Sequence, residues 1–290
     1  MSKFNKLCAC AIALCGAFSA FAQAPAGAPG APGAPGRPAG APQMQQRPRQ
    51  AEVIPGRTPV SPKLEDYFTP VTAEAATPDQ DGFIRRWLLL EPIAKPNRSN
   101  TVFVDSYIRE AFAKQYFKGQ LATDKLPKDG QKEKVEVDVT PQAMGFPMPG
   151  QEPQKVEPKF EKRTLKWHAL DSKRFNVKLF RFASGLQTDV YGVIFWAVTV
   201  VDCPEEIQNV RLSVGSNAGS QWWVNGEDVL LLSNDRRMVA DDAMSDRITL
   251  KKGRNYIWGA VINGPGMSDM CVRFVDEQGK PVTNFTVNTK

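Results

Sequence analysis

Histidine is almost absent from this sequence, which has one histidine, His168, among its 290 residues. A zinc site draws on several histidines and cysteines, and a serine hydrolase needs a base beside its nucleophile. The chain also has no G-x-S-x-G motif and no G-x-x-x-x-G-K phosphate loop. We therefore predict no catalytic residue, and we interpret His168 as a structural or exposed side chain. An uncharacterised esterase or hydrolase remains the least favoured alternative.

Cysteine is also scarce in the part of the chain that can fold. Of the five cysteines, Cys8, Cys10 and Cys15 lie in the first 22 residues, and only Cys203 and Cys271 lie beyond them. Two cysteines in a secreted protein can form a disulfide, and two buried thiols are an equally good interpretation. We take Cys203 and Cys271 as the disulfide candidate.

Long hydrophobic runs are missing, and the one short run lies at the N-terminus. Residues 1–22 combine Lys3 and Lys6, an apolar stretch over 7–18, and small residues at Ala20 and Ala22. This pattern is typical of a secretory signal peptide, and the apolar stretch is too short to span a membrane. We expect cleavage after Ala22, export across the inner membrane, and a periplasmic or cell-surface protein with no transmembrane segment after cleavage.

The part of the chain that is predicted to fold has little net charge, because most of the excess positive charge lies in the N-terminal residues. The formal net charge is +6, and removal of Lys3 and Lys6 with the signal leaves +4. Residues 23–62 carry +3 of this, so the remainder is close to neutral. Nucleic-acid binding by the folded part therefore has little support. Residues 23–62 are rich in alanine, proline and glycine and are predicted to form a disordered linker.

The rest of the chain predicts an all-β fold, a jelly-roll sandwich with one short helix. Short apolar or alternating segments separated by turns run from 82 to 287, and the run over 190–203 suits a strand buried on both faces. Residues 101–117 predict the helix, 175–184 another strand, and 128–163 a mobile, polar insertion with one short polar strand or hairpin in it. Asn225-Gly226, between two apolar segments, predicts a tight hairpin turn.

Three segments carry a family resemblance: "LSVGSNAGSQWWVNGEDV", "DRITLKKGRNYIWGAVIN" and "CVRFVDEQGKPV". They resemble the galactose-binding-like jelly roll of carbohydrate-binding modules and of family-2 glycoside hydrolases. The segments "FIRRWLLLEPI" and "LKWHALDS" are similar to the non-catalytic β-domain of acetylxylan-esterase-like proteins of gut Bacteroidetes. The resemblance implies the fold and a carbohydrate-binding type of module. The usual Asp-Asp before the hairpin is replaced here by Asn217-Ala218.

The adjacent tryptophans Trp222 and Trp223 supply the main hypothesis about a binding site. Neighbouring side chains of a strand point to opposite faces, so one indole enters a core while the other meets a ligand or is covered by protein. A sugar stacked on the outward indole could be held by polar side chains nearby in sequence. The candidate ligand-binding residues are Trp222, Trp223, Asn225, Asp235, Arg236 and Arg237.

Acidic residues in the loop that follows suggest one cofactor. Asp241, Asp242 and Asp246 could bind a structural calcium ion, although a solvated loop is the more frequent interpretation and no EF-hand spacing is present. The main prediction is a secreted, non-catalytic module that binds a polysaccharide or oligosaccharide. The alternative is a structural accessory or assembly protein of the cell envelope with a protein partner and no affinity for glycans.

Overall fold

The computed structural model describes residues 63–96, 102–114, 121–140, 157, 159–264 and 266–290. The predicted signal peptide and linker lie outside these residues. The described part begins with the 3-10 helix η1 (Leu64–Asp66) and strand β1 (Phe68–Pro70). Strand β1 pairs with the end of β5, so the predicted start of the domain near Gly82 is too late. A three-residue strand has too little pattern to be recognised before its partner is known.

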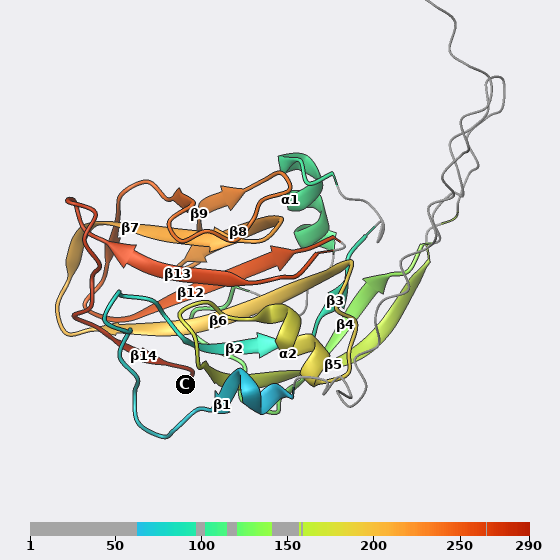
Figure 1. Ribbon diagram of the computed structural model, residues 1–290, viewed down its shortest axis with the longest axis horizontal. Helices are drawn as coiled ribbons and strands as arrows, with labels where there is room; N and C mark the ends of the chain where they lie inside the picture. The colour runs from blue at the N-terminus through green and yellow to red at the C-terminus, as the bar shows by residue number, and fades with distance from the viewer. Residues whose placement is uncertain (1–62, 97–101, 115–120, 141–156, 158, 265) are drawn as a thin grey trace, which may run out of the picture. The chain divides into compact units, whose positions relative to one another are not determined.

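A large antiparallel sheet forms the centre of the protein (Figure 1). Its main path joins seven strands side by side, and three further strands pair with β5 or β6. In spatial order the path runs through β1, β5 (Phe160–Ser172), β2 (Arg86–Leu90), β6 (Val193–Cys203), β12 (Gly253–Ile262), β8 (Gly219–Val224) and β9 (Glu227–Leu232). The additional strands are β3 (Ile93–Ala94) and β14 (Thr286–Asn288) on β6, and β4 (Lys132–Asp138) on β5.

A smaller, four-stranded antiparallel sheet packs against one face of the large one. It contains β10 (Ala243–Met244), β7 (Ile207–Ser216), β11 (Ile248–Leu250) and β13 (Met270–Val275). Apolar side chains from both sheets form one continuous core, to which β7 contributes Val210, Leu212 and Val214. Two facing sheets with a shared apolar core make a β-sandwich, which confirms the predicted all-β fold.

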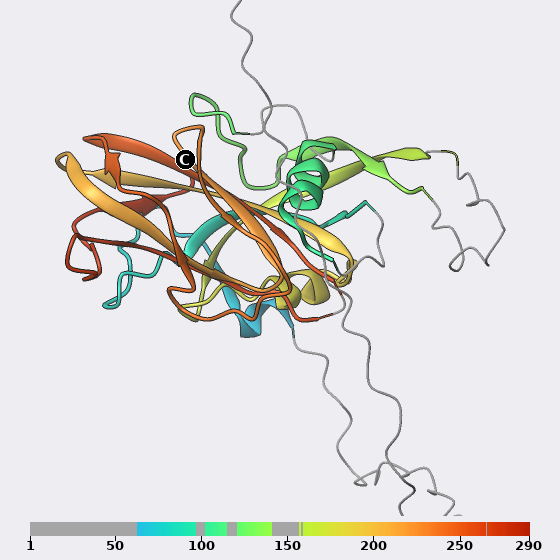
Figure 2. The ribbon, with the colours of Figure 1, turned by 90° about the horizontal axis from the view of Figure 1, so that it is seen from above.

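The outer face of the large sheet has a second core of its own. Strand β6 sends Phe195 and Ala197 into the sandwich core and Trp196 and Val198 into the second core, as the alternation of a strand requires. Helix α1 (Asp105–Lys114) covers this second core with Ile108 and other apolar side chains. Figure 2 shows α1 and helix α2 (Leu179–Gly185) on opposite sides of the large sheet. The prediction that this strand is buried on both sides is confirmed.

Helix α2 replaces a predicted strand. Residues 175–184 alternate well enough to suggest a strand, but only Val177 makes an isolated bridge, to Met270. Leu179, Phe182 and Ala183 then follow at helical spacing, and all three are buried in the sandwich core. The prediction of one helix was therefore wrong, because the described residues contain two α-helices.

The Asn225-Gly226 turn is where it was predicted. Both residues have positive φ angles, 53° and 86°, and join β8 directly to β9. Asparagine and glycine adopt this conformation at low cost, which makes the turn readable from sequence alone.

The predicted polar insertion contains a long hairpin. Strand β4 pairs over its whole length with the first part of β5, from Lys132 opposite Lys166 to Asp138 opposite Phe160. Its inward side chains Val135 and Val137 belong to the second core, and the hairpin extends beyond the end of the sandwich (Figure 1). Residues 141–156 and 158 lie outside the described residues.

The two cysteines are free and buried in the structure, which agrees with the interpretation as two buried thiols and contradicts the disulfide candidate. Cys203 ends β6, shortly before β7 begins, whereas Cys271 pairs with Gly215 near the far end of β7. At roughly 3.3 Å per residue, the length of β7 separates the thiols by on the order of 25 Å, well beyond disulfide geometry. Burial raises the pKa of Cys203 to about 11 and that of Cys271 to about 12.

A thiol titration tests this arrangement. The unfolded, unreduced chain lacking residues 1–22 should titrate two thiols, and the native protein should react slowly because burial keeps both as neutral thiols. A reductant should leave the unfolding midpoint unchanged, whereas loss of a disulfide would lower stability by roughly 2–4 kcal/mol. Absence of titratable thiols after unfolding would contradict the structure.

Candidate functional site

The two tryptophans point to opposite faces of the large sheet, and both are buried. Trp222 is fully buried in the sandwich core, where its ring meets Trp87 edge-on at 6.1 Å between centroids. Trp223 is 7% exposed in the second core, where it stacks on Trp196 at 5.7 Å and contacts Phe112 of α1 edge-on. The hypothesis that one indole forms an exposed ligand face is therefore wrong, because α1 covers the outer face of β8.

Glycine at position 259 makes room for Trp222. Gly259 lies opposite Trp222 in the pairing of β12 with β8. A Cβ atom at residue 259 would lie 2.3 Å from the Trp222 ring, which is far inside contact distance. The indole nitrogen of Trp222 donates to Ser220 Oγ at 2.9 Å, so the side chain is fully satisfied inside the core.

Asn225 has a structural role in the hairpin. Its Oδ1 accepts a hydrogen bond from the backbone N–H of Tyr256 at 2.9 Å, and its Nδ2 donates to Asn255 Oδ1 at 3.0 Å. Both polar groups of the amide thus hold the turn to β12. The structure places Asn225 apart from the three charged candidates described next.

Asp235, Arg236 and Arg237 do gather, in a cavity of about 450 Å³ at one end of the sandwich. Asn217 and Ala218, from the two-residue turn between β7 and β8, line the cavity with them. The remaining lining residues come from the loop after β12: Asn263, Gly264, Gly266 and Met267. Three loops that are distant in sequence therefore converge on one polar pocket.

Backbone hydrogen bonds and one ion pair preorganise the cavity. The Ala218 N–H donates to the Arg236 carbonyl at 2.9 Å, and Ala218 has a φ of 51°, in the left-handed region that L-residues rarely adopt. Arg236 Nε lies 2.5 Å from Asp242 Oδ2, and this hydrogen bond raises the pKa of the arginine. The Arg236 guanidinium is thus held in place before any ligand arrives, whereas Asp235 and Arg237 are exposed.

The loop after β12 is tied to the start of β6 by a buried amide. Asn263, 1% exposed, accepts from the Val193 N–H and donates to the carbonyls of Val190 and Gly266 at 3.2–3.3 Å. Its two donors and its acceptor hold this loop to the stretch that leads into β6. The wall of the cavity that this loop forms is therefore fixed by the fold.

An exposed tyrosine that packs on a half-buried phenylalanine neighbours this loop, and it was missed in the sequence. Tyr191 is 47% exposed and packs against Phe180 of α2 with ring centroids 5.6 Å apart. Gly192, next to Tyr191, donates its N–H to the carbonyl of Gly264, which lines the cavity. Tyr191 had been assigned to the start of a buried strand. Its position in a turn with a following glycine is the signal that could have revealed it.

Two aspartates of the acidic loop form ion pairs with arginine side chains. Asp241 Oδ1 accepts from Arg273 Nε at 2.9 Å and from Ser213 Oγ at 2.5 Å, and Asp242 pairs with Arg236. Burial acts to raise the pKa of Asp241, but the hydrogen bonds from Arg273 and Ser213 outweigh it and lower that pKa. The described residues contain no group of three potential metal ligands. Of the three carboxylates that a calcium ion would need, those of Asp241 and Asp242 are engaged by Arg273, Ser213 and Arg236, and Asp246 is exposed.

The single histidine pairs with a glutamate. His168 Nε2 lies 3.0 Å from Glu91 Oε1, and the histidine ring contacts Phe182 edge-on at 5.5 Å. The other Glu91 oxygen accepts the Lys166 N–H at 3.2 Å, which ties β5 to the end of β2. These contacts agree with the structural interpretation of His168.

Comparison with known proteins finds only remote likeness. No protein-family model and no curated protein sequence matches the chain. Among solved structures, a PA14 sugar-binding domain from an RTX adhesin aligns at 10% identity over 70% of this chain and 96% of its own, with a TM-score of 0.35. An anti-sigma factor domain-containing protein aligns at 12% identity over 68% and 96%, with a TM-score of 0.28.

An α-L-rhamnosidase of Streptomyces avermitilis, solved with L-rhamnose, aligns at 9% identity over 74% of this chain and 22% of its own, with a TM-score of 0.19. Likeness at this level assigns no function.

In the described part of the chain, no helix has the length and apolar character to cross a membrane.

Proposed function

We propose that this protein is a secreted, non-catalytic carbohydrate-binding module of galactose-binding-like type. We propose that its ligand site is the cavity lined by Asp235, Arg236 and Arg237. The observation that carries the proposal is the convergence of these side chains with Asn217 in a cavity of about 450 Å³; Gly264 of its wall bonds to Gly192, which follows the exposed Tyr191. The signal-like N-terminus and the jelly-roll resemblance of the sequence support export and the class of ligand.

The chemistry of the cavity suits a sugar. Hydroxyl groups need fixed donors and acceptors, which the Arg236 guanidinium, the Asp235 carboxylate and the Asn217 side chain supply. The apolar face of a pyranose ring needs an aromatic surface, which Tyr191 offers beside the cavity. Each requirement is met by a different loop, so the binding surface depends on the folded sandwich.

Glycan binding by cavity variants tests the proposal. Wild-type protein should be retained on at least one member of a polysaccharide panel. Arg237→Ala should raise the Kd at least tenfold, since a hydrogen bond to a charged group is worth about 1.5–3 kcal/mol. Tyr191→Ala should raise it severalfold through loss of stacking, worth about 0.5–1.5 kcal/mol. Isothermal titration with the retained glycan provides the measurement.

Arg247→Ala is the matched control. Arg247 is an exposed arginine beside β11, which pairs with the start of β7, away from the turn that lines the cavity. Its loss should leave glycan affinity unchanged, and all three variants should keep the wild-type melting temperature. Equal affinity of Arg237→Ala and wild type would remove the cavity as the site, and failure to bind any glycan would remove the function.

One observation favours the alternative, an assembly protein of the envelope. The hairpin of β4 and β5 extends beyond the sandwich and exposes Phe160 by 49% near its outer end (Figure 1). A projecting hairpin with an exposed aromatic ring is a form that proteins use to contact partners. If no glycan binds, shortening this hairpin and measuring co-purification with envelope proteins is the next experiment.

A further inference from the structure

A second cavity lies on the outer face of the large sheet, the face that the small sheet does not cover. Its lining differs in chemistry from that of the first cavity. Its volume is about 590 Å³. Val71, Leu126 and Tyr256, three of its lining residues, pack against the second core. Pro127 and Ala169 add further apolar surface, so the inner wall is largely hydrophobic.

The segment over 124–129 forms one wall and is anchored at both ends. Before it, the Ala122 carbonyl accepts a hydrogen bond from the indole nitrogen of Trp258 at 3.2 Å. At its end, Asp129 Oδ1 accepts the Ala169 N–H at 2.9 Å, and Gly130 donates its N–H to the Trp167 carbonyl. The cavity is therefore held open by contacts to the sheet, which favours a preformed ligand site.

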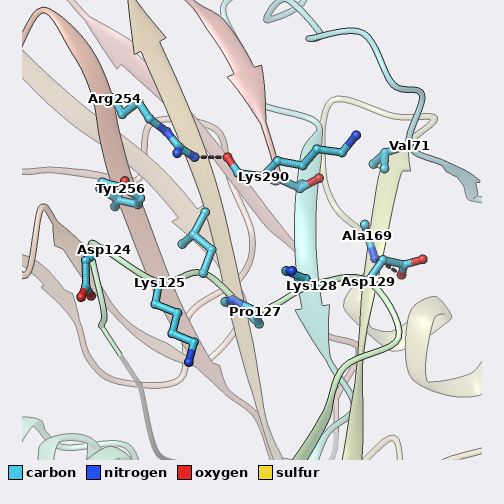
Figure 3. Close-up of a pocket in the computed structure, with 12 residues that line it drawn as sticks. Val71, Asp124, Lys125, Pro127, Lys128, Asp129, Ala169, Arg254, Tyr256 and Lys290 are labelled. Carbon is cyan, nitrogen blue, oxygen red and sulfur yellow. Dashed lines mark hydrogen bonds between the residues drawn. The ribbon is translucent and has the colours of Figure 1, made fainter.

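The opposite wall holds a fixed cation. Figure 3 shows Arg254 and Lys290 across the cavity from the segment that carries Lys125, Pro127 and Lys128. Arg254 donates from Nη2 to a backbone oxygen of Lys290, the last residue of the sequence, and its guanidinium lies 5.4 Å from the centre of the Tyr256 ring. A guanidinium oriented by these two contacts keeps other N–H groups for a ligand.

The charges around the opening favour an anion. Arg254, Lys125, Lys128 and Lys290 have exposed cationic side chains at the cavity, against the carboxylates of Asp124 and Asp129. Asp129 is already engaged by the Ala169 N–H, whereas Asp124 is an exposed carboxylate at the opening. An apolar interior with a cationic rim is complementary to a molecule with an apolar body and an anionic head.

We propose that this cavity binds an amphipathic carboxylate, whose apolar body lies against Leu126 and Tyr256 and whose carboxylate pairs with Arg254. This site is separate from the proposed glycan cavity and does not depend on it. The two cavities share no lining residue.

Titration calorimetry with three probes that share a ten-carbon chain tests the proposal on the protein lacking residues 1–22. Decanoate, kept below its micelle concentration, should bind saturably. 1-Decanol should bind at least tenfold more weakly, because it lacks the charge that Arg254 pairs with. Decyltrimethylammonium should bind more weakly still, since its charge has the wrong sign.

Three variants and two controls locate the site. Arg254→Gln should weaken decanoate binding about tenfold and leave decanol binding unchanged, and Tyr256→Ala should weaken both. Arg247→Gln, an exposed arginine that does not line the cavity, should bind like wild type, as should Arg237→Ala in the glycan cavity. Circular dichroism should show wild-type melting for Arg254→Gln. Lys128→Gln is the second charge variant and should weaken decanoate selectively.

Four results would overturn the inference. The first three are the absence of saturable decanoate binding, equal binding of the cationic probe, and decanoate binding that neither Arg254→Gln nor Lys128→Gln weakens. Saturable binding of an uncharged oligosaccharide that Tyr256→Ala abolishes and Arg237→Ala does not would also overturn it, by making this cavity a sugar site. Loss of glycan binding in Arg237→Ala with decanoate binding intact would separate this inference from the proposed function.

Discussion

Replacing either Trp222 or Trp223 by alanine is expected to destabilise the protein by about 3–5 kcal/mol. Trp222 is fully buried between the sheets and Trp223 is 7% exposed beneath α1, so each truncation leaves a cavity that the surrounding strands cannot close. Chemical unfolding monitored by circular dichroism measures both losses. Gly259→Ala should also destabilise the fold, because the new methyl group would overlap the Trp222 ring.

Phe160→Ala is the matched control for the tryptophan variants. Phe160 is 49% exposed in the projecting hairpin, so its removal should change the free energy of unfolding by less than about 1 kcal/mol. A Trp223→Ala variant with the same free energy of unfolding as the wild type would contradict the structure, since it would mean that α1 does not cover β8. Such a result would restore the exposed-indole hypothesis that the structure rejects.

Replacing Asp171 by alanine is expected to cost about 3–5 kcal/mol of stability, because it leaves a buried arginine without its counter-charge. Arg86 is 5% exposed, and its Nε and Nη2 atoms each lie 2.8 Å from an oxygen of Asp171. The same guanidinium donates to the Glu74 carbonyl and to Thr72 Oγ1 at 3.1 Å. The pair thus also holds the segment after β1 to the sheet.

Two further variants separate the effect of the unpaired Arg86 charge on stability from the effect of lost packing. Arg86→Met combined with Asp171→Leu removes both charges and should recover a large part of the loss, since apolar residues can replace a buried ion pair. Glu161→Ala, in the same strand, breaks an exposed pair with Arg163 at 3.5 Å and should cost less than about 1 kcal/mol. An Asp171→Ala variant as stable as Glu161→Ala would show that Arg86 reaches water.

The local parts of this fold were predictable. The Asn225-Gly226 turn depends on the φ preferences of two adjacent residues, and the central strand β6 depends on a continuous apolar run. Strand parity likewise placed Trp222 and Trp223 on opposite faces. Helix α2 was missed because the segment from Val177 to Ala183 fits both the alternation of a strand and the spacing of a helix. Packing against the sandwich core decides between them.

Only the residues of the candidate site that are neighbours in the sequence could be predicted. Asp235, Arg236 and Arg237 stand together in a polar loop, and their neighbourhood is visible in the chain itself. Asn217, Tyr191 and the loop over 263–267 reach the same place only through the pairing of β6, β7, β8 and β12. Short-range patterns do not contain that information.

The sequence by itself determined the class of fold, the tight hairpin and the opposite directions of the two indoles, since each follows from the conformational preferences of neighbouring residues. Only the tertiary structure decided that α1 covers Trp223, that the two thiols lie at opposite ends of β7, and that three loops enclose a polar cavity. These outcomes depend on contacts between segments far apart in the chain, whose free energy of packing no local pattern records.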